Sequence, residues 1–551
     1  MKKITAALVL DFLFSIINCS AQQSINWQWA KQGISTGSSN ESVSTATDHF
    51  HHIYTTGYFE SPAIIFDSLF VTSNGYYDIF LAKHDENGNI LWVRSAGGTN
   101  SDLGKSVATD LDGNIYVTGV FYSTSITFGS TNLLNNSGSD FFLAKYDSAG
   151  NVLWAKNMGG NGSDNGEDVA IDANGNVYVT GAFHSPLVIF GSDTLINNGQ
   201  EDIFVAKFDS SGNVLWVKNP GGSSYDEGVS ICTDANSNIL ITGFFSSPSI
   251  TFGNIVLTNP GIFVAKYDSS GNVLWAKGSG GLGGSGRGIC TDKSNNILLT
   301  GSFENSISFD SITLTGTWHD QVFIAKYDAS GNALWAKRGT GINQDFGEKV
   351  VTDNNKNVYI IGSFNMPYIT FDSTTINGPL NSVSPLFIAI FDSLGNIICT
   401  EALESGGWSD GMDIAMDDYG GAYITSNFSE PNIFTIGNDS LFLTGNENVF
   451  LAKFNSGTVQ GINNTDFKKN KITFYPNPAF DIASISLNNI ENRAGEIRII
   501  DVYGKIVYVQ QLQSLNSNLP IKINVSNFSK GIYFFIIADG KGKTVNKFVK
   551  E

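Results

Sequence analysis

The residues best suited to chemistry are aspartates that recur at a constant spacing along the chain. An Asp-x-Gly pattern occurs at Asp102, Asp164, Asp226 and Asp345, and Asp410 lies one residue out of phase with it. Hard cations are bound by clustered oxygen ligands, so these carboxylates could ring a cation or a polyol. The same pattern can be structural, because Asp caps a loop and the Gly accepts a positive φ. We favour the structural interpretation, since a residue repeated in nearly every unit serves what every unit shares.

Two further motifs invite a metal interpretation. The stretch from Asp110 to Asn114 is similar to the start of an EF-hand loop, but no Glu follows at the required distance, so a hairpin turn is expected. His49, His51 and His52 cluster in one turn, yet adjacent histidines in extended chain point to opposite faces. No Ser, Cys or Thr lies in a recognisable nucleophile motif. The sequence therefore predicts no catalytic residue, no metal ligand and no cofactor, with a structural cation as the one alternative.

The elements that must position these aspartates are repeated β-hairpins. Residues 141–156 read FFLAKYDSAGNVLWAK, with an Asp-x-x-Gly-Asn turn between two short runs of alternating apolar and polar residues. The alanine of this motif recurs at steps of 59 to 64 residues, which is the mark of a repeat architecture. The copies are Ala82, Ala144, Ala206, Ala265, Ala325, Ala389 and Ala452.

Each unit reads as four strands joined by hairpins, with an irregular excursion such as residues 185–202 before the closing strand, which is typical of a propeller blade. Trp29 lies in an outer strand that has no hairpin partner before it, and residues 450–454 form a partner strand that has no outer strand after it. Pairing of these two strands would leave no free edge between the first and last blades. The sequence therefore predicts an all-β fold: a seven-bladed β-propeller, closed by N- and C-terminal strand pairing, over residues 22–454.

Composition limits the partners of this chain. It has 551 residues, 59 of them Gly, and a net charge of −19 with its 32 Lys and Arg residues dispersed singly. Phosphate backbones and anionic membranes are poor partners for such a surface, so we expect no nucleic-acid binding.

The N-terminus has the features of an export signal. Residues 1–21 contain two lysines, an apolar core and a small-x-small site that ends at Ala21. Cys19 leaves a lipoprotein alternative open, although the large Asn18 before it is unfavourable. No later segment reaches the length of a membrane span, so the remainder is expected to be exported. Cys232 and Cys290 occupy the same place in successive repeats, either as small buried residues or as a bridged pair.

The repeats, taken together, resemble the seven-bladed propeller repeats called SBBP repeats, which occur in exported bacterial proteins. The resemblance covers about residues 26–454 and implies a fold, because members of that family mostly have no assigned biochemical role. The Asp-x-x-Gly-x-x-x-Trp hairpin is also similar to the Asp-box of sialidases. Its spacing differs, however, and the propeller has only Arg94, Arg287 and Arg338 where those enzymes need an arginine cluster.

A second pattern begins after a polar linker at residues 455–472. Short alternating strands fill residues 473–551, which predicts a small β-sandwich. This segment resembles the C-terminal sorting domain of the type IX secretion system of Bacteroidota, which implies passage through the outer-membrane secretion machinery. The matching motif residues are Tyr475, Pro476, Asn477, Pro478, Gly504, Lys505, Gly531, Tyr533 and Lys550.

These features favour a secreted or surface-displayed binding scaffold that reaches the outside via the periplasm and binds a glycan or protein. Variable excursions, such as residues 122–140 and 366–385, would contact that ligand from a rigid frame. The alternative is an extracellular polysaccharide hydrolase or lyase whose site lies at the propeller channel mouth, which a unit-specific carboxylate pair would favour. A structural surface-layer role is a third interpretation.

Overall fold

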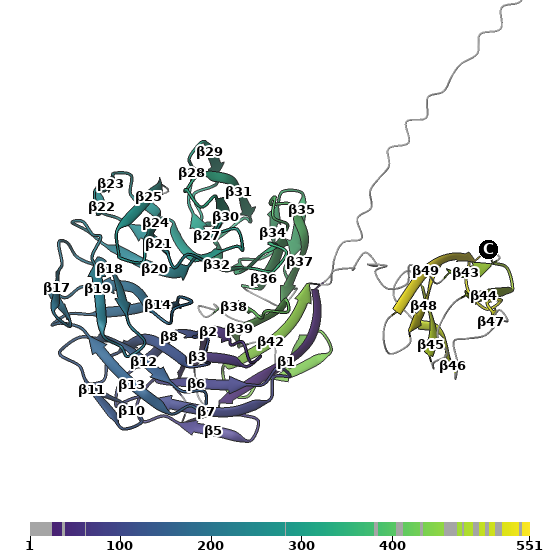
Figure 1. The fold of residues 1–551 in the computed structure, drawn as a ribbon, viewed down its shortest axis with the longest axis horizontal. Coiled ribbons are helices and arrows are strands. Elements are labelled where there is room, and N and C mark those ends of the chain that lie inside the picture. The colour runs from purple at the N-terminus through teal and green to yellow at the C-terminus, as the bar shows by residue number, and fades with distance from the viewer. Residues whose placement is uncertain are drawn as a thin grey trace, which may run out of the picture. The chain divides into compact units, whose positions relative to one another are not determined.

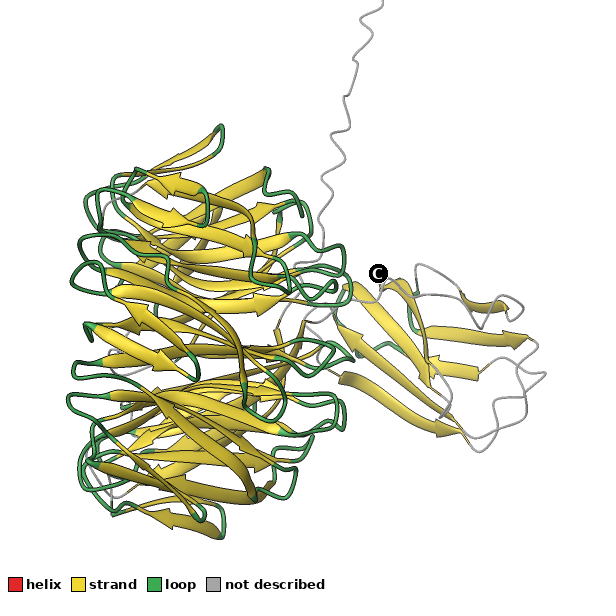
Figure 2. Cartoon of the chain, turned by 60° about the vertical axis from the view of Figure 1, so that its left-hand side comes forward, coloured by secondary structure: helices red, strands yellow, loops and turns green. Residues whose placement is uncertain are grey.

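The computed structural model describes residues 25–35, 39–60, 62–280, 283–379, 384–403, 412–429, 433–456, 471–475, 479–488, 495–501, 506–512, 521–538 and 543–550. These residues form strands and turns without a helix, so the all-β prediction is confirmed for them (Figure 2). Within these ranges no helix is available to cross a membrane. The chain divides into two compact units, Met1–Gly457 and Thr458–Glu551, which are described separately.

The first unit is a series of antiparallel sheets arranged around a common centre (Figure 1). The larger sheets each contain four strands in the spatial order inner, second, third, outer, and two of them are extended by an outer hairpin to six strands. The inner strands are β2 (Asn40–Thr47), β8 (Asp102–Thr109), β14 (Asp164–Ile171), β20 (Asp226–Thr233), β26 (Ser285–Thr291), β32 (Asp345–Thr352) and β38 (Asp413–Met416). The second strands are β3 (Ile53–Phe59), β9 (Ile115–Phe121), β15 (Val177–Phe183), β21 (Ile239–Phe245), β27 (Ile297–Phe303), β33 (Val358–Phe364) and β39 (Gly421–Phe428).

The remaining strands of these sheets carry the hairpin motif. The third strands are β6 (Asp78–His84), β12 (Asp140–Tyr146), β18 (Asp202–Phe208), β24 (Gly261–Tyr267), β30 (Gln321–Tyr327), β36 (Leu386–Phe391) and β42 (Asn448–Ser456). The outer strands are β7 (Ile90–Ala96), β13 (Val152–Met158), β19 (Val214–Lys218), β25 (Val273–Gly280), β31 (Ala333–Thr340), β37 (Ile397–Leu403) and β1 (Ile25–Ser35).

The burial pattern explains why these sheets stack face to face. Every residue of the second strand β9 and the third strand β12 is buried, whereas the outer strand β13 alternates with solvent. Strands buried on both faces read as continuous apolar runs. In β9 the glycine of the Thr-Gly-x-Phe motif is required, because a Cβ on Gly119 would lie 2.0 Å from the carbonyl oxygen of Leu103. Phe121, which ends this motif, is fully buried, as the sequence predicts.

The excursions differ from the prediction of irregular chain, because each contains a short hairpin. These outer hairpins are β4 (Ala63–Phe66) with β5 (Leu69–Thr72), β10 (Ser125–Phe128) with β11 (Thr131–Leu134), β16 (Leu187–Phe190) with β17 (Asp193–Ile196), β22 (Ile250–Phe252) with β23 (Ile255–Leu257), β28 (Ser306–Phe309) with β29 (Ile312–Thr315), β34 (Tyr368–Phe371) with β35 (Thr374–Asn377), and β40 (Ile433–Ile436) with β41 (Asp439–Phe442). A left-handed residue, such as Gly191 at φ 58° or Asp310 at φ 52°, makes each tight turn possible.

Strands from the two ends of the first unit share one sheet. β1 pairs antiparallel with β42, and Ala30 lies opposite Ala452 (Figure 1). The inner strands contact one another in the sequence β2, β8, β14, β20, β26, β32, β38, and β38 in turn contacts β2.

The Trp and Lys of each hairpin motif join one sheet to the next. Trp92 Nε1 and Lys83 Nζ both donate to the carbonyl oxygen of Ser148, at 3.2 and 2.9 Å. Ser148 belongs to the hairpin turn of the following sheet, so the motif that forms each hairpin also fastens its neighbour. The same pairs of donors reach Ser210, Ser269, Ala329 and Ser393.

Cys232 and Cys290 are free thiols on neighbouring inner strands. They do not form a bridge, and burial raises the pKa of both thiols well above its ordinary value. Both side chains are half-buried and pack against apolar clusters, so they act as small packing residues.

The second unit contains two antiparallel sheets. One has the order β43 (Lys471–Tyr475), β44 (Ile482–Asn488), β47 (Ile521–Asn524), and the other β46 (Ile506–Leu512), β45 (Gly495–Asp501), β48 (Gly531–Ala538), β49 (Lys543–Lys550). Buried residues of both sheets, including Ile485 and Phe535, form one apolar cluster. Two sheets packed over a shared core are the arrangement of a β-sandwich.

Candidate binding site

The inner strands end in tight turns whose aspartates hold the backbone. Asp110 Oδ1 accepts the amides of Asp112 and Asn114 at 3.0 and 2.9 Å, and its Oδ2 accepts Asn114 Nδ2 and the hydroxyl of Tyr116. Gly113 completes the turn at φ 78°. The stretch that is similar to a calcium loop is therefore a hairpin turn whose carboxylate is occupied by hydrogen bonds.

These turns surround a cavity of about 430 Å³ at the ends of the inner strands. In five of the turns the residue after the aspartate lines the cavity, and these residues are His49, Leu111, Ala173, Ala235 and Asp418. Ligand sites are concave, with aromatic or apolar walls and a few well-placed polar groups. The cavity is lined by Thr47, Asp48, His49, Thr109, Asp110, Leu111, Ile171, Asp172, Ala173, Thr233, Asp234, Ala235, Met416 and Asp418.

One side of the cavity carries residues that no other repeat has. His49 Nδ1 lies 2.7 Å from a carboxylate oxygen of Asp418. Beside this pair the ring of His51 packs on Tyr419, with centroids 4.6 Å apart. Tyr419 and Phe50 are 80% and 58% exposed. The exposed rings of Phe50 and Tyr419, which are next in sequence to His49 and Asp418, offer stacking faces near groups that can form hydrogen bonds with a polar ligand. We call His49, Phe50, His51, Asp418 and Tyr419 the aromatic rim.

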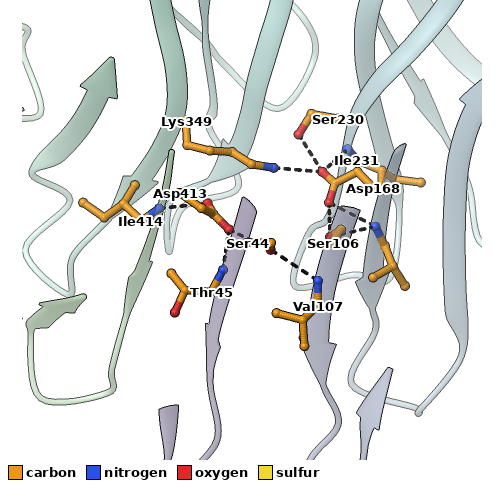
Figure 3. A network of polar contacts seen from close by, with 11 residues as sticks. Ser44, Thr45, Ser106, Val107, Asp168, Ser230, Ile231, Lys349, Asp413 and Ile414 are labelled. Atoms are coloured by element: carbon orange, nitrogen blue, oxygen red, sulfur yellow. Dashed lines mark hydrogen bonds and ion pairs between the residues drawn. The ribbon is translucent and has the colours of Figure 1, made fainter. Parts of the chain in front are cut away.

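Below the turns, charges from non-neighbouring sheets meet between the inner strands (Figure 3). Lys349 Nζ of β32 lies 3.2 Å from Asp168 Oδ2 of β14. Burial alone would lower the pKa of Lys349, but the carboxylates of Asp168 and Asp413 hold it above its ordinary value. Asp413 accepts Ser44 Oγ at 2.8 Å and the amide of Ile414. This network ties sheets together across the centre of the unit.

The sequence contained a signal for this network that prediction missed. Ser44, Ser106 and Ser230 occupy one position of the inner strands, and Asp168, Lys349 and Asp413 replace serine there in other repeats. Ser106 and Ser230 both donate to Asp168, at 2.6 and 2.8 Å. A charged residue at a strand position that holds serine in several other repeats therefore indicates a site that belongs to one repeat.

The aspartates predicted from the Asp-x-Gly pattern lie at the other end of the inner strands. Asp102 begins β8 and is fully buried. It accepts the amide of Gly98 at 2.7 Å and Ser123 Oγ at 2.7 Å, so it caps its own loop. None of these residues lines the cavity at the turns. A ligand-binding role for them stays a prediction. Asp164 and Asp226 cap their loops in the same way, Asp345 accepts the amide of Asn365, and Asp410 lies outside the described residues.

Near those strand starts lie three glutamates that do not recur in every repeat. Burial and the neighbouring Glu167 and Glu201 raise the pKa of Glu227 to about 8, against a smaller opposing effect of Lys105. Lys105 Nζ lies 3.8 Å from Glu167, and His184 Nδ1 lies 3.2 Å from Glu201. A carboxyl group that keeps its proton near neutral pH can act as a general acid.

The histidine cluster separates into different contacts. His52 Nδ1 lies 2.9 Å from Asp48, within its own turn, while His49 contacts Asp418. Among the described residues no group of His, Cys, Asp and Glu side chains is arranged to hold a metal ion.

The predicted sorting residues are only partly described. Tyr533 donates from its hydroxyl to the carbonyl of Ser529 at 2.8 Å and packs on Phe528. Ala479, the last residue of the Tyr-Pro-Asn-Pro-Ala motif, donates its amide to Val549 at 2.7 Å, which joins both ends of this unit. Tyr475 ends β43, Gly531 begins β48 and Lys550 ends β49, whereas Pro476, Asn477, Pro478, Gly504 and Lys505 lie outside the described residues.

Comparison with known families supports both parts of the chain. Residues 473–551 match the secretion system C-terminal sorting domain, and residues 91–120 and 153–182 match the β-propeller repeat. The chain therefore carries SBBP propeller repeats and a type IX secretion sorting domain. This domain indicates export through type IX secretion to the cell surface or outside, and interaction with that machinery.

Relatives of the whole chain are distant. An uncharacterized WD repeat-containing protein of Acanthamoeba polyphaga mimivirus is 26% identical over 494 residues, which cover 72% of this chain and 35% of that protein. The regulatory protein FlaEY of Caulobacter vibrioides is 28% identical over 201 residues, which cover 34% of this chain and 21% of that protein. This chain thus spans well under half the length of either relative.

Solved structures match the chain only at low sequence identity and low TM-score. A chain of a mitotic checkpoint complex has a TM-score of 0.37 and 9% identity, covering 82% of this chain and 99% of that one. A member of the duf4221 family from Bacteroides vulgatus has a TM-score of 0.31 and 12% identity, covering 79% of this chain and 99% of that one.

Proposed function

We propose that this protein is an exported binding scaffold, built as a closed seven-bladed propeller, that holds a glycan in the cavity beside the aromatic rim. The pairing of β1 with β42 and the contact of β38 with β2 support a closed ring. Closure would leave the inner strands around one axis, so that their turns form a single mouth. Loops on such a rigid frame can diversify without loss of the fold.

The observation that carries the binding role is the aromatic rim itself. Repeats that otherwise share their turns depart from one another at His49, Phe50 and Tyr419, and these side chains are not used by the core. Exposed aromatic side chains that lie near one another beside polar groups are typical of interaction surfaces, which favours a contact function. A sugar offers a ring face for Tyr419 and hydroxyls for the His49–Asp418 pair.

A second candidate is a polysaccharide hydrolase or lyase, favoured by one observation. Burial and the neighbouring carboxylates of Glu167 and Glu201 raise the pKa of Glu227 to about 8. A carboxyl group with a raised pKa close to other carboxylates can supply a general acid beside a base. This candidate places the chemistry at the starts of the inner strands and not at the aromatic rim.

The proposed route assigns roles to the chain's segments. Residues 1–21 would direct the chain to the periplasm of a member of Bacteroidota and be removed. The propeller would occupy residues 22–454, residues 455–472 would serve as linker, and residues 473–551 would be recognised by the secretion machinery. Release or attachment to the surface would follow.

Two experiments test this proposal. Removing residues 473–551 is expected to abolish appearance of the protein outside the cell, while the intact chain appears there. The purified protein is then applied to a glycan array, beside a polysaccharide hydrolysis screen. Retention of particular glycans without product supports the scaffold, and turnover without retention supports the enzyme and contradicts the scaffold.

A further inference from the structure

At the circumference of the first unit, an ion pair closes the groove between neighbouring sheets. Lys277 Nζ of β25 lies 2.6 Å from Asp310, and Lys337 Nζ of β31 lies 2.8 Å from Asp372. Each aspartate sits in the turn of the next outer hairpin, in the left-handed conformation at φ 52° and 50°. Asp310 also accepts the amide of Ala333, the first residue of β31, at 2.8 Å. One carboxylate thus satisfies a lysine and a strand amide.

The groove between β19 and the β22–β23 hairpin lacks this carboxylate. Gly253 occupies the place of Asp310, with a similar φ of 57°. Lys218 occupies the place of Lys277, and it forms no ion pair or side-chain hydrogen bond with any described residue. Its Cε packs beside Gly271, where a Cβ would come within 2.9 Å. The partly buried side chain of Lys218 is therefore left without the carboxylate that Lys277 and Lys337 have.

A cavity of about 430 Å³ fills this groove, and Tyr267 reaches it from the core. Tyr267 is 1% exposed, and its hydroxyl has no hydrogen-bond partner among the described residues. A buried hydroxyl without a partner destabilises a fold, so such groups normally face a ligand or water. Lys218, Gly253, Tyr267 and Val273 all line the cavity.

These features coincide at no other of the grooves whose residues the structure describes. Where Gly191 replaces the aspartate beside Lys156, Phe208 stands in the place of Tyr267 and offers no hydroxyl. Where Gly129 replaces it, Arg94 donates to the carbonyls of Gly150 and Ala149. The groove at Lys218 alone combines an uncompensated cation, an unpartnered hydroxyl and space.

We propose that this groove is a second binding site, specific for an acidic saccharide whose carboxylate or sulfate group takes the position of the absent aspartate. Lys218 Nζ would donate a charge-assisted hydrogen bond to that group, as Lys277 does to Asp310. The amide of Val273 corresponds to that of Ala333, and Tyr267 would donate to a ring or hydroxyl oxygen. The volume is in the range of small-ligand pockets, well above that of a bare anion.

The test titrates the purified protein with a uronic-acid disaccharide, a sulfated disaccharide and a neutral disaccharide, by calorimetry. We expect one or both acidic probes to bind and the neutral probe not to bind, and their difference identifies the carboxylate or the sulfate. Gly253→Asp should fill the site internally and weaken binding at least about ten-fold, with the unfolding midpoint unchanged or raised. Lys218→Met should weaken binding to a similar extent.

Matched variants separate this site from the rest of the molecule. Lys156→Met should leave the affinity for the acidic disaccharide unchanged, whereas Asp310→Gly should add a second weak site beside Lys277. Failure of both acidic probes to bind, equal binding of the neutral probe, or unchanged affinity in Gly253→Asp and Lys218→Met would each overturn the proposal. Because the variants of this test alter the groove at Lys218 and not the aromatic rim, either site can fail without the other.

Discussion

Lys326 Nζ lies 2.9 Å from Asp292 Oδ2, and both side chains are almost completely buried. In other repeats a tyrosine donates to the equivalent aspartate, as Tyr116 does to Asp110. The lysine of that repeat lies farther away, with Lys145 Nζ 3.6 Å from Asp110 Oδ2. Leu298 replaces that tyrosine in the repeat of Asp292. The lysine thus approaches the turn where the hydroxyl is missing, and Lys266 does the same at Asp234, at 2.9 Å.

We predict that Lys326→Met destabilises the protein by about 3 kcal/mol, because it leaves Asp292 as a buried charge without its cation. Lys145→Met should cost only about 1 kcal/mol, since Tyr116 still donates to Asp110. Chemical denaturation of the two variants measures the difference.

Burial alone would raise the pKa of Asp292, but Asn296 and Lys326 hold it below its ordinary value. This stabilisation should therefore vanish as the pH falls through that lowered pKa. Equal losses of unfolding free energy in the two variants would contradict the proposal that the lysine takes over the role of the missing tyrosine hydroxyl.

The central charge network makes a second prediction. Lys349→Met should destabilise the protein by about 3 kcal/mol, because Asp168 is buried and receives a cation from a distant sheet. Replacing both Lys349 and Asp168 by serine restores the residue of the other repeats and should recover only part of that loss, since Asp413 then remains a buried carboxylate without its cation. Lys293→Met, at an exposed turn, is the control and should change the unfolding free energy by less than about 0.5 kcal/mol. A double variant as unstable as Lys349→Met would argue against charge as the cause.

Stability should depend on pH through buried aspartates. Burial raises the pKa of Asp345 to about 8, and that of Asp78 and Asp140 to about 6. The folded state therefore holds protons that the unfolded chain releases near pH 4, so this contribution is present in acid and is lost as pH rises through about 6 and 8.

The test is the variant Asp345→Asn. Its free energy of unfolding should exceed that of the wild type by about 2–4 kcal/mol at pH 9 and should differ little from it at pH 5. Asp392→Asn is the comparison, since the hydrogen bonds of Asn396 and nearby amides outweigh burial and lower its pKa. That substitution should destabilise at neutral pH. Parallel stability curves of wild type and Asp345→Asn between pH 5 and 9 would rule out the predicted coupling.

Removal of residues 22–35 tests the strand that joins the ends of the repeat array. Without β1, the edge of β42 would expose unpaired amides and carbonyls, which favours association between chains. We expect a lower unfolding temperature and oligomers in size-exclusion chromatography with light scattering. As a control, replacing Gln28 by Thr, at an exposed position of the same strand, should leave a monomeric elution profile unaltered. A stable truncated chain that elutes as the control does would contradict a closed ring.

The repeat spacing predicted most of the strands because each hairpin carries its own turn chemistry and burial pattern. The short outer hairpins were missed, since strands of three or four residues have too little alternation to be distinguished from loop. Their turn signal, Gly191 or Asp310 after a Phe, is visible in retrospect.

The candidate sites were harder to predict from the sequence than the strands. Prediction chose the aspartates that recur, such as Asp102, and recurrence marks the loop caps that every unit needs. The network of Lys349 and Asp168 joins residues 181 positions apart, and only the arrangement of the sheets brings them together. Likewise, the significance of Gly253 depends on what Asp310 contacts in the next groove.

The aromatic rim is the centre of the proposed function, and one measurement addresses it directly. A glycan retained on the array is titrated into the wild type and into Tyr419→Ala, while the same solutions are assayed for released product. We predict saturable binding by the wild type, at least about ten-fold weaker binding by Tyr419→Ala, and no product from either. Equal affinity of the two proteins, or product that accumulates with turnover, would contradict the account.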